Sequence, residues 1–277
     1  MLDIFGYAFM QRAMVAGVLI GALCAVIGVY VVLKGLSFIG AGISHASFGG
    51  VAIGVALGFN PIWSAVVLCV LTAWGIGLVA RKGNVREDTA VGVFFASTMA
   101  LGILIISLSR SYQVDLFGYL FGSITAVAAE DMWTTIAMAL VVLAGVAFLY
   151  KDLIFTVFDP EMAEVTGVPA GKVYFALITM MALTVVMSIK VVGIVLVSAL
   201  IVTPAAAAYQ LTESFRNMMG LSVLFGVGSC VAGLLVSYWL GMAPGATIVL
   251  LVTLAFFLCA LISPRRRRIR AERQDRP

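Results

Sequence analysis

Charged residues are scarce in this chain of 277 residues: Asp, Glu, Lys and Arg together make up 11%. Soluble domains carry about 25% charged and about 45–50% apolar residues, whereas hydrophobic residues reach 63% here. Because a soluble chain of this length needs many more charges to cover its surface, the composition excludes an ordinary soluble protein. No polar block is long enough to fold alone, so we predict one membrane domain over residues 1–264 and a basic tail over residues 265–277.

Residues that carry catalysis or hold metals are also few. The chain has one histidine, and its four cysteines lie in apolar runs without forming a CxxC pair: Cys24, Cys69, Cys230 and Cys259. A disulfide framework or a thiolate metal site is therefore not expected. HExxH and GxSxG are absent, and residues 167–172 (GVPAGK) miss the spacing of a phosphate-binding loop. We expect a protein that is not an enzyme and has no permanently bound cofactor. If ATP powers it, the ATPase is another polypeptide.

Long apolar runs fill the rest of the chain. A membrane-spanning helix needs about 20 apolar residues, and nine stretches qualify or nearly qualify: 13–33, 38–58, 62–80, 89–108, 132–150, 173–189, 191–210, 218–240 and 245–263. The apolar stretch 116–127 is too short to span and predicts a re-entrant or interfacial helix. The start of the chain has no basic region and no cleavage site, so we expect the first run to stay in the membrane. The predicted fold class is all-α, a polytopic membrane protein with about eight or nine transmembrane helices; one long broken helix near Lys190 is the alternative to two spans there.

Lys and Arg are distributed unevenly among the predicted loops. Fourteen fall on the side of the loop at Lys34, a side that includes loop 151–172 and the tail, and three fall on the other: Arg12, Arg110 and Lys190. Cytoplasmic loops carry such an excess, which predicts an outside N-terminus and a cytoplasmic C-terminus. The arginine-rich tail follows an apolar helix and is typical of an anchor on anionic lipid, so the lipid bilayer is the expected partner and nucleic acid is not.

The second predicted span carries small residues at every fourth position: Gly42, Ala46, Gly50, Gly54 and Gly58. They share one helix face, and small residues let helix backbones approach closely in a bilayer. We predict that this face is a helix-packing surface. Pro204 is expected to kink the span over 191–210, because it removes a backbone donor, and the alanines beside it also allow close packing.

His45 lies beside this stripe, seven residues into the span. That is roughly 10 Å below the predicted cytoplasmic end at 1.5 Å per residue, and an ionisable side chain at such a depth normally faces the bundle interior or a polar cavity. Neutral imidazole is a good ligand for transition metals. A structural hydrogen bond, with Ser44 and Ser47 close by, is the alternative. On the predicted outer side, Asp115 is either an acidic ligand for an arriving cation or a solvated loop charge.

A short cytoplasmic helix is predicted within loop 151–172. Asp159 suits the N-cap, Pro160 the first helical position, and Gly167 the left-handed position past the end. Two turns are marginal in isolation, so the membrane domain or a partner protein must hold this helix. Met162 and Val165 give it an adhesive edge, which favours docking of a partner over an ordinary amphipathic connector.

Together these segments resemble the membrane permeases of the metal-type ABC importers, which serve zinc and manganese uptake in bacteria. The resemblance runs from about residue 9 to 263 and is carried by six segments: 34–40 (KGLSFIG), 43–46 (ISHA), 115–123, 159–167, 192–200 and 203–206. It implies a permease homodimer in the bacterial cytoplasmic membrane and an extracytoplasmic metal-binding protein. It also implies cytoplasmic ATPase subunits that grip a coupling helix formed by Asp159, Glu161, Met162, Glu164 and Gly167.

The resemblance also implies a role for His45 on the path of the metal. Many relatives carry an aspartate shortly before this histidine, where the present chain has Ala41, so Asp115 is the better acidic candidate. The predicted cargo is a divalent metal, zinc first and manganese next. Two alternatives remain, a secondary cation carrier driven by ion gradients and an ABC permease for an iron chelate. The carrier is disfavoured because such proteins usually hold acids within the membrane, and every Asp and Glu here falls in a loop or at a span end.

Overall fold

The computed structural model describes residues 8–83, 85–108, 116–122 and 129–263, and within them it contains helices and no strand. This confirms the all-α prediction. The helices are α1 (Ala8–Lys34), α2 (Ser37–Leu57), α3 (Pro61–Lys82), α4 (Glu87–Leu108), α5 (Leu116–Phe121), α6 (Ala129–Phe148), α7 (Tyr150–Phe158), α8 (Pro160–Val165), α9 (Ala170–Val192), α10 (Ile194–Leu211), α11 (Phe215–Leu240) and α12 (Pro244–Ile262).

Eight of these helices are long and apolar enough to cross a membrane. Helices α6 and α7 together make a ninth candidate that bends by 67° between Phe148 and Tyr150. The prediction of eight or nine transmembrane helices is thus confirmed. Near Lys190 the structure has two helices, since α9 ends at Val192 and α10 begins at Ile194. Only Gly193 separates them, with a φ of 90° that L side chains rarely adopt.

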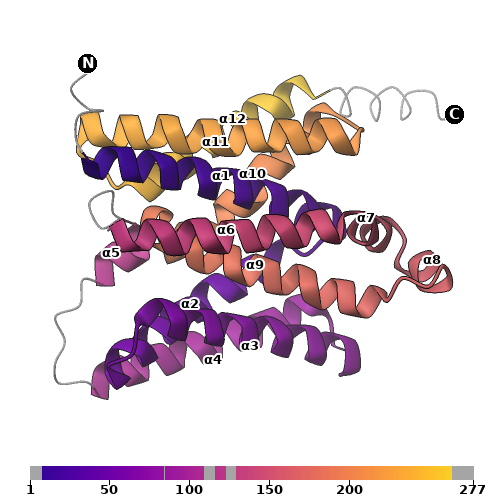
Figure 1. The fold of residues 1–277 in the computed structure, drawn as a ribbon, viewed down its shortest axis with the longest axis horizontal. Coiled ribbons are helices and arrows are strands. Elements are labelled where there is room, and N and C mark those ends of the chain that lie inside the picture. The colour runs from indigo at the N-terminus through magenta and orange to yellow at the C-terminus, as the bar shows by residue number, and fades with distance from the viewer. Residues whose placement is uncertain (1–7, 84, 109–115, 123–128, 264–277) are drawn as a thin grey trace, which may run out of the picture.

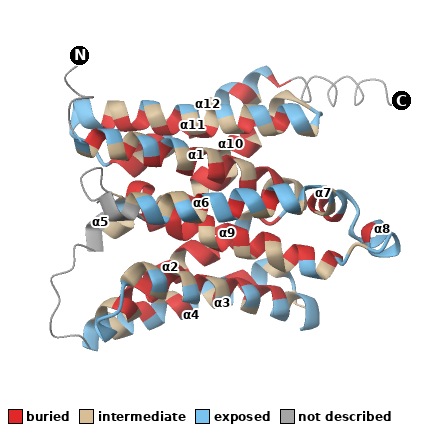
Figure 2. Ribbon diagram, in the orientation of Figure 1, coloured by how far each residue is buried: buried red, intermediate tan, exposed pale blue. Residues whose placement is uncertain are grey.

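The helices form three layers, and α9 lies in the middle layer (Figure 1). One outer layer contains α2, α3 and α4, and the other contains α1, α10, α11 and α12. Helices α6 and α9 lie between them, and α9 packs against α1, α2, α3, α6, α7 and α10. Figure 2 shows the consequence: α9 is largely buried, whereas α3, α4, α11 and α12 turn exposed faces outward.

The side chains on these outer faces are large and apolar, for example Leu104, Leu250 and Leu261. Lipid tails are as apolar as leucine, so this surface suits a bilayer.

The two ends of the bundle differ in their content of lysine and arginine. We call the end where α1 and α3 finish and where α9 and α11 begin the basic end, because it holds Lys34, Arg81, Lys82, Lys172 and Arg216. Helix α8 projects from the basic end, and α5 lies at the opposite end (Figure 1). The loops that the sequence analysis assigned to one side of the membrane therefore do lie at one end.

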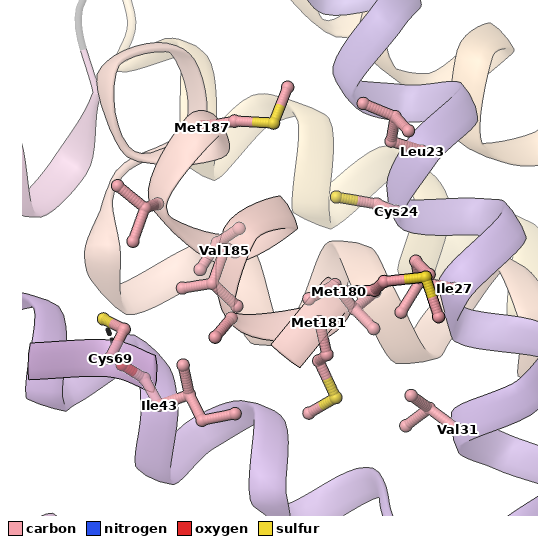
Figure 3. Close-up of a cluster of buried hydrophobic side chains, with 14 of the residues drawn as sticks. Leu23, Cys24, Ile27, Val31, Ile43, Cys69, Met180, Met181, Val185 and Met187 are labelled. Carbon is pink, nitrogen blue, oxygen red and sulfur yellow. Dashed lines mark hydrogen bonds between the residues drawn. The ribbon is translucent and has the colours of Figure 1, made fainter. Parts of the chain in front are cut away.

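The core lies where α9 meets α1, α2 and α3 (Figure 3). Methionines from α9 fill much of this space, and methionine adapts well to irregular gaps. The buried side chains drawn there include Leu23, Cys24, Ile27 and Val31 of α1, Ile43 of α2, Cys69 of α3, and Met180, Met181, Val185 and Met187 of α9. All four cysteines are free and buried.

The small-residue stripe of α2 faces α3 and α4. A Cβ on Gly50 would come within 2.5 Å of the Cα of Ala65, and one on Gly54 within 2.7 Å of the Cα of Pro61. Gly42 is tight too, with a Cβ there 3.0 Å from Val91 of α4, and Ala46 is fully buried. These glycines allow α2 to pack closely on its two neighbours.

Gly58 is a correction to the predicted stripe. It ends α2 in the left-handed conformation, with a φ of 70°, and no atom of the described residues lies within 4 Å of the position of a Cβ. Its role is therefore helix termination, and the packing face stops at Gly54. Pro204 is buried inside α10, which continues through it to Leu211.

Candidate metal path and coupling helix

His45 lies on α2, half-buried, with its ring 4.4 Å from the ring of Phe95 on α4. Its Nδ1 is 2.9 Å from the carbonyl oxygen of Ala41, one turn earlier in the same helix. A carbonyl can only accept a hydrogen bond, so Nδ1 is the donor, and in the neutral imidazole Nε2 then holds the lone pair. Metal-binding histidines are commonly held in this way, by a hydrogen bond from the other ring nitrogen to a backbone carbonyl.

The two serines beside His45 do not bond to it. Ser44 donates to the carbonyl of Gly40 at 2.8 Å, and Ser47 donates to the carbonyl of Ser44. Both bonds stay within α2, so the polar groups of this turn are satisfied locally and the imidazole does not bridge to a neighbouring helix through them. This arrangement leaves Nε2 available to a ligand.

Among the described residues no group of three or more His, Cys, Asp and Glu side chains could hold a metal ion. Asp115, the predicted acidic partner, lies outside the described residues. His45 is thus the candidate ligand that the structure places, and its role in binding a metal stays a prediction.

Helix α8 has the ends that the sequence predicts. The side chain of Asp159 accepts a hydrogen bond from the backbone N–H of Met162 at 2.9 Å, and Pro160 occupies the first turn. Gly167 follows the helix with a φ of 90°. Ala163 is fully buried and fixes the helix to the bundle, whereas Met162 is 53% exposed and Val165 is 82% exposed. The Glu161 and Glu164 side chains are exposed as well.

Two features near α8 were not found from the sequence. The first is α7, most of which falls within the predicted loop 151–172. It carries Leu153 and Val157 four residues apart, both buried, so its spacing of apolar residues was the signal available. The second is Lys34, whose Nζ donates to the carbonyl of Thr156 at 2.8 Å. That bond ties the end of α1 to the last turn of α7, directly before the coupling helix, and no sequence pattern indicates it.

At the opposite end of the bundle, the backbone after α5 packs directly against the backbone of the α9–α10 break and of α12. A Cβ on Gly122, after α5, would lie 2.8 Å from the carbonyl carbon of Val192. One on Gly193 would lie 2.5 Å from the carbonyl carbon of Phe121, and one on Gly245, in α12, 2.8 Å from the Phe121 oxygen. We call Gly122, Gly193 and Gly245 the glycine junction. It holds the short helix α5 against the break between α9 and α10.

The fold and this arrangement define a class: a multi-pass, all-helical membrane protein with a capped, exposed helix projecting from its basic end. The family follows from comparison. The chain belongs to the ABC 3 transport family, whose model matches residues 6–263. It is therefore a membrane permease of an ABC transporter.

Individual relatives span almost the whole chain. The manganese transport system membrane protein MntC of Listeria monocytogenes is 40% identical, over 94% of this chain and 92% of the relative. The chelated iron transport system membrane protein YfeD of Yersinia pestis is 35% identical, over 93% of this chain and 86% of the relative. The structure of PsaBC from Streptococcus pneumoniae in complex with a Fab matches with a TM-score of 0.88 at 32% identity, covering 98% of this chain and 97% of the other.

Proposed function

We propose that this chain is the permease subunit of an importer for divalent transition-metal ions, with manganese as the principal cargo. The observation that carries the proposal is the near full-length likeness to permeases named for manganese transport, at 40% identity for the Listeria protein. The sequence alone predicts zinc before manganese, and the names of those relatives reverse that order.

His45 is the proposed contact for the ion on its way through α2. In the neutral imidazole Nδ1 donates to the carbonyl of Ala41, and Nε2 can then offer its lone pair to a metal. One imidazole among few acids gives weak binding, which suits a path that must release its cargo. Asp115 is proposed as a further ligand on the outer side.

The proposed assembly has two copies of the permease, cytoplasmic ATPase subunits at α8 and an extracytoplasmic metal-binding protein that delivers the ion. The basic end is proposed to face the cytoplasm of a bacterium, in keeping with the positive-inside rule. Exposed Met162 and Val165 support an ATPase contact there, because exposed apolar side chains at an end that faces water are suited to a partner.

The test is metal accumulation in cells that lack their own manganese importers and express this permease with its ATPase and binding protein. We expect manganese uptake that stops when the ATPase cannot hydrolyse ATP. His45→Ala should lower uptake on the order of 10-fold or more, because loss of even an outer-shell partner of a metal ligand costs that much. Ser44→Ala, which removes a hydrogen bond made only within α2, is the matched control and should leave uptake near that of the unmodified protein.

Two outcomes would contradict the proposal. Normal uptake by a well-expressed His45→Ala variant would remove this residue from the path. Uptake that persists in vesicles without ATP would favour the gradient-driven carrier instead.

A permease for chelated iron is the second candidate, favoured by the 35% identity to YfeD. Competition decides between the two. Excess chelated iron should leave uptake of radioactive manganese unchanged. Uptake of radioactive chelated iron that excess manganese does not suppress would assign the chain to iron.

A further inference from the structure

A groove of about 700 Å³ opens on the surface between α3, α6 and α9. It belongs neither to the His45 region nor to the coupling helix. Its walls are almost wholly apolar, with Val141 and Gly145 from α6 and Phe175 and Leu183 from α9. Its end nearest α8 is different, because Arg81 and Lys172 line it there.

The Arg81 guanidinium is held in place at this end. Its Nη1 lies 2.8 Å from the position that a Cβ on Gly171 would occupy, so it rests against the backbone of α9. Its central carbon is 5.4 Å from the centroid of the Tyr174 ring, a cation–π contact. Glu87 is engaged by Tyr174, whose hydroxyl donates to its Oε1 at 3.2 Å. Among the residues that the structure describes, Arg81 is thus positioned by an aromatic ring and a glycine instead of by a bonded carboxylate, and its charge is available to an anion.

The middle of the groove offers no free polar group from Trp74 or Thr179. The indole N–H of Trp74 donates to Oγ1 of Thr179 at 2.8 Å, and Thr179 donates in turn to the carbonyl of Phe175 at 2.7 Å. Trp74 and Phe175 also pack edge to face, with their ring centroids 6.4 Å apart. Below the two basic residues the groove therefore presents hydrocarbon.

The length of the groove matches the thickness of the hydrocarbon layer of one leaflet. Lys172 and Leu183 both lie on α9, and eleven residues of helix span roughly 16 Å. The hydrocarbon core of a bilayer is about 30 Å thick, so half of it is about the same length. The groove thus has positive charge at the level of the headgroups and apolar walls that extend through one leaflet. This pattern complements the shape and charge of an anionic phospholipid.

We propose that this groove is a binding site for an anionic phospholipid of the leaflet at the basic end. The lipid phosphate lies between Arg81 and Lys172, and an acyl chain lies along Phe175, Thr179 and Leu183. Basic pockets between transmembrane helices bind anionic headgroups, and the guanidinium fork suits phosphate oxygens. A second copy of the chain is disfavoured as the occupant, because a two-fold contact on this patch would bring the basic residues of both copies together.

The experiment measures quenching of Trp74 by brominated lipids in the permease purified with its ATPase. A variant with Trp63, Trp133 and Trp239 changed to Phe leaves Trp74 as the permease's one indole, and the same variant with W74F added measures the fluorescence that the ATPase contributes. Dibrominated phosphatidylglycerol should quench at roughly 20-fold lower concentration than dibrominated phosphatidylcholine, as two basic groups near a headgroup imply. In the same background, R81Q/K172Q should lose this preference.

K82Q/R86Q is the matched control. It removes the same charge from exposed positions near the same end that do not line the groove, and it should keep the preference. Because Arg81 also packs on Tyr174, K172Q alone provides a milder variant, with the preference reduced about fivefold.

Equal quenching by the two lipids, or a preference that survives in R81Q/K172Q, would overturn the proposal. So would quenching by neither lipid together with a disulfide between copies of a Val141→Cys variant. That result would make the groove a contact between two permeases.

Discussion

At Gly50 the backbone of α2 lies against that of α3 with no side chain between them. The atoms that a Cβ would meet are the Cα and N of Ala65 and the carbonyl oxygen of Ser64, all of them backbone. Backbone cannot rotate out of the way as a flexible side chain can, so even a methyl group must push the two helices apart. The same helix carries His45, so its position on α3 and α4 also sets the position of the imidazole.

We predict that Gly50→Ala lowers the free energy of unfolding by about 1–3 kcal/mol, the usual cost of overpacking. Gly228→Ala is the control, because Gly228 is also inside a helix and nothing lies within 4 Å of its Cβ position. The control should be neutral or slightly stabilising. Thermal unfolding of the two variants in the same detergent measures the difference, and equal melting temperatures would contradict the packing argument.

At the scale of single residues, the sequence predicted packing positions where small residues recur at a regular spacing. Gly42, Ala46, Gly50 and Gly54 recur every four residues, and such spacing places them on one face of a helix. Gly58 has the same spacing, yet the helix ends before it. The boundary depends on the left-handed turn that leads to Asn60 and α3, and a periodic pattern alone does not locate a boundary.

Helices α7 and α8 lie at the basic end and extend from the bundle (Figure 1). Helix α7 leaves α6 at 67°, and α8 follows it after a single residue, Asp159. Asp159 caps α8, Ala163 fixes it, and Lys34 holds the preceding turn of α7. A six-residue helix would be marginal alone, and these contacts stabilise it while Met162 and Val165 stay exposed.

We predict that M162A/V165A lowers co-purification of the ATPase by an order of magnitude, as loss of two apolar anchors of an interface implies. Because both side chains are exposed, the permease itself should fold and melt as before. The control is L240A/M242A, two apolar residues of similar exposure, 66% and 52%, near the opposite end. Undiminished ATPase recovery with M162A/V165A would show that the contact lies elsewhere.

The long helices and α8 could be predicted from the sequence because their signals are local: about 20 apolar residues for a span, and a cap, a proline and a glycine for α8. Helix α7 was missed because it is short and the membrane span beside it runs directly into it. The hydrogen bond from Lys34 to Thr156 joins residues far apart in the chain. No local pattern encodes such a contact, and the same holds for the ring of Phe95 over His45.

At the scale of the whole molecule, the ends of α3 test the orientation of the protein. Its 22 residues run from Pro61 to Lys82, which gives roughly 33 Å of helix, enough to cross a bilayer core of about 30 Å. Phe59 precedes it at the opposite end and Lys82 ends it at the basic end, and both are exposed. The four native cysteines are buried, so a new cysteine at either place can be labelled with little background.

We predict that Phe59→Cys reacts with a membrane-impermeant thiol reagent in intact cells, whereas Lys82→Cys reacts only after the cells are opened. The physical reason is the excess of Lys and Arg at the basic end, which keeps that end in the cytoplasm. Labelling is read as a mass shift on a gel. The reverse pattern would invert the topology and would place α8 out of reach of a cytoplasmic ATPase.

The glycine junction has a consequence for how this protein tolerates change. Its closest contacts are made by backbone atoms, which every amino acid possesses. Only the three glycine positions depend on residue type, because a side chain there would not fit. Mutations around it replace only side chains, and the closest approaches use none. We therefore expect the glycine junction, which joins α5, the α9–α10 break and α12, to keep its geometry when the side chains around it are substituted. At this end of the bundle the backbone contacts should tolerate mutation best.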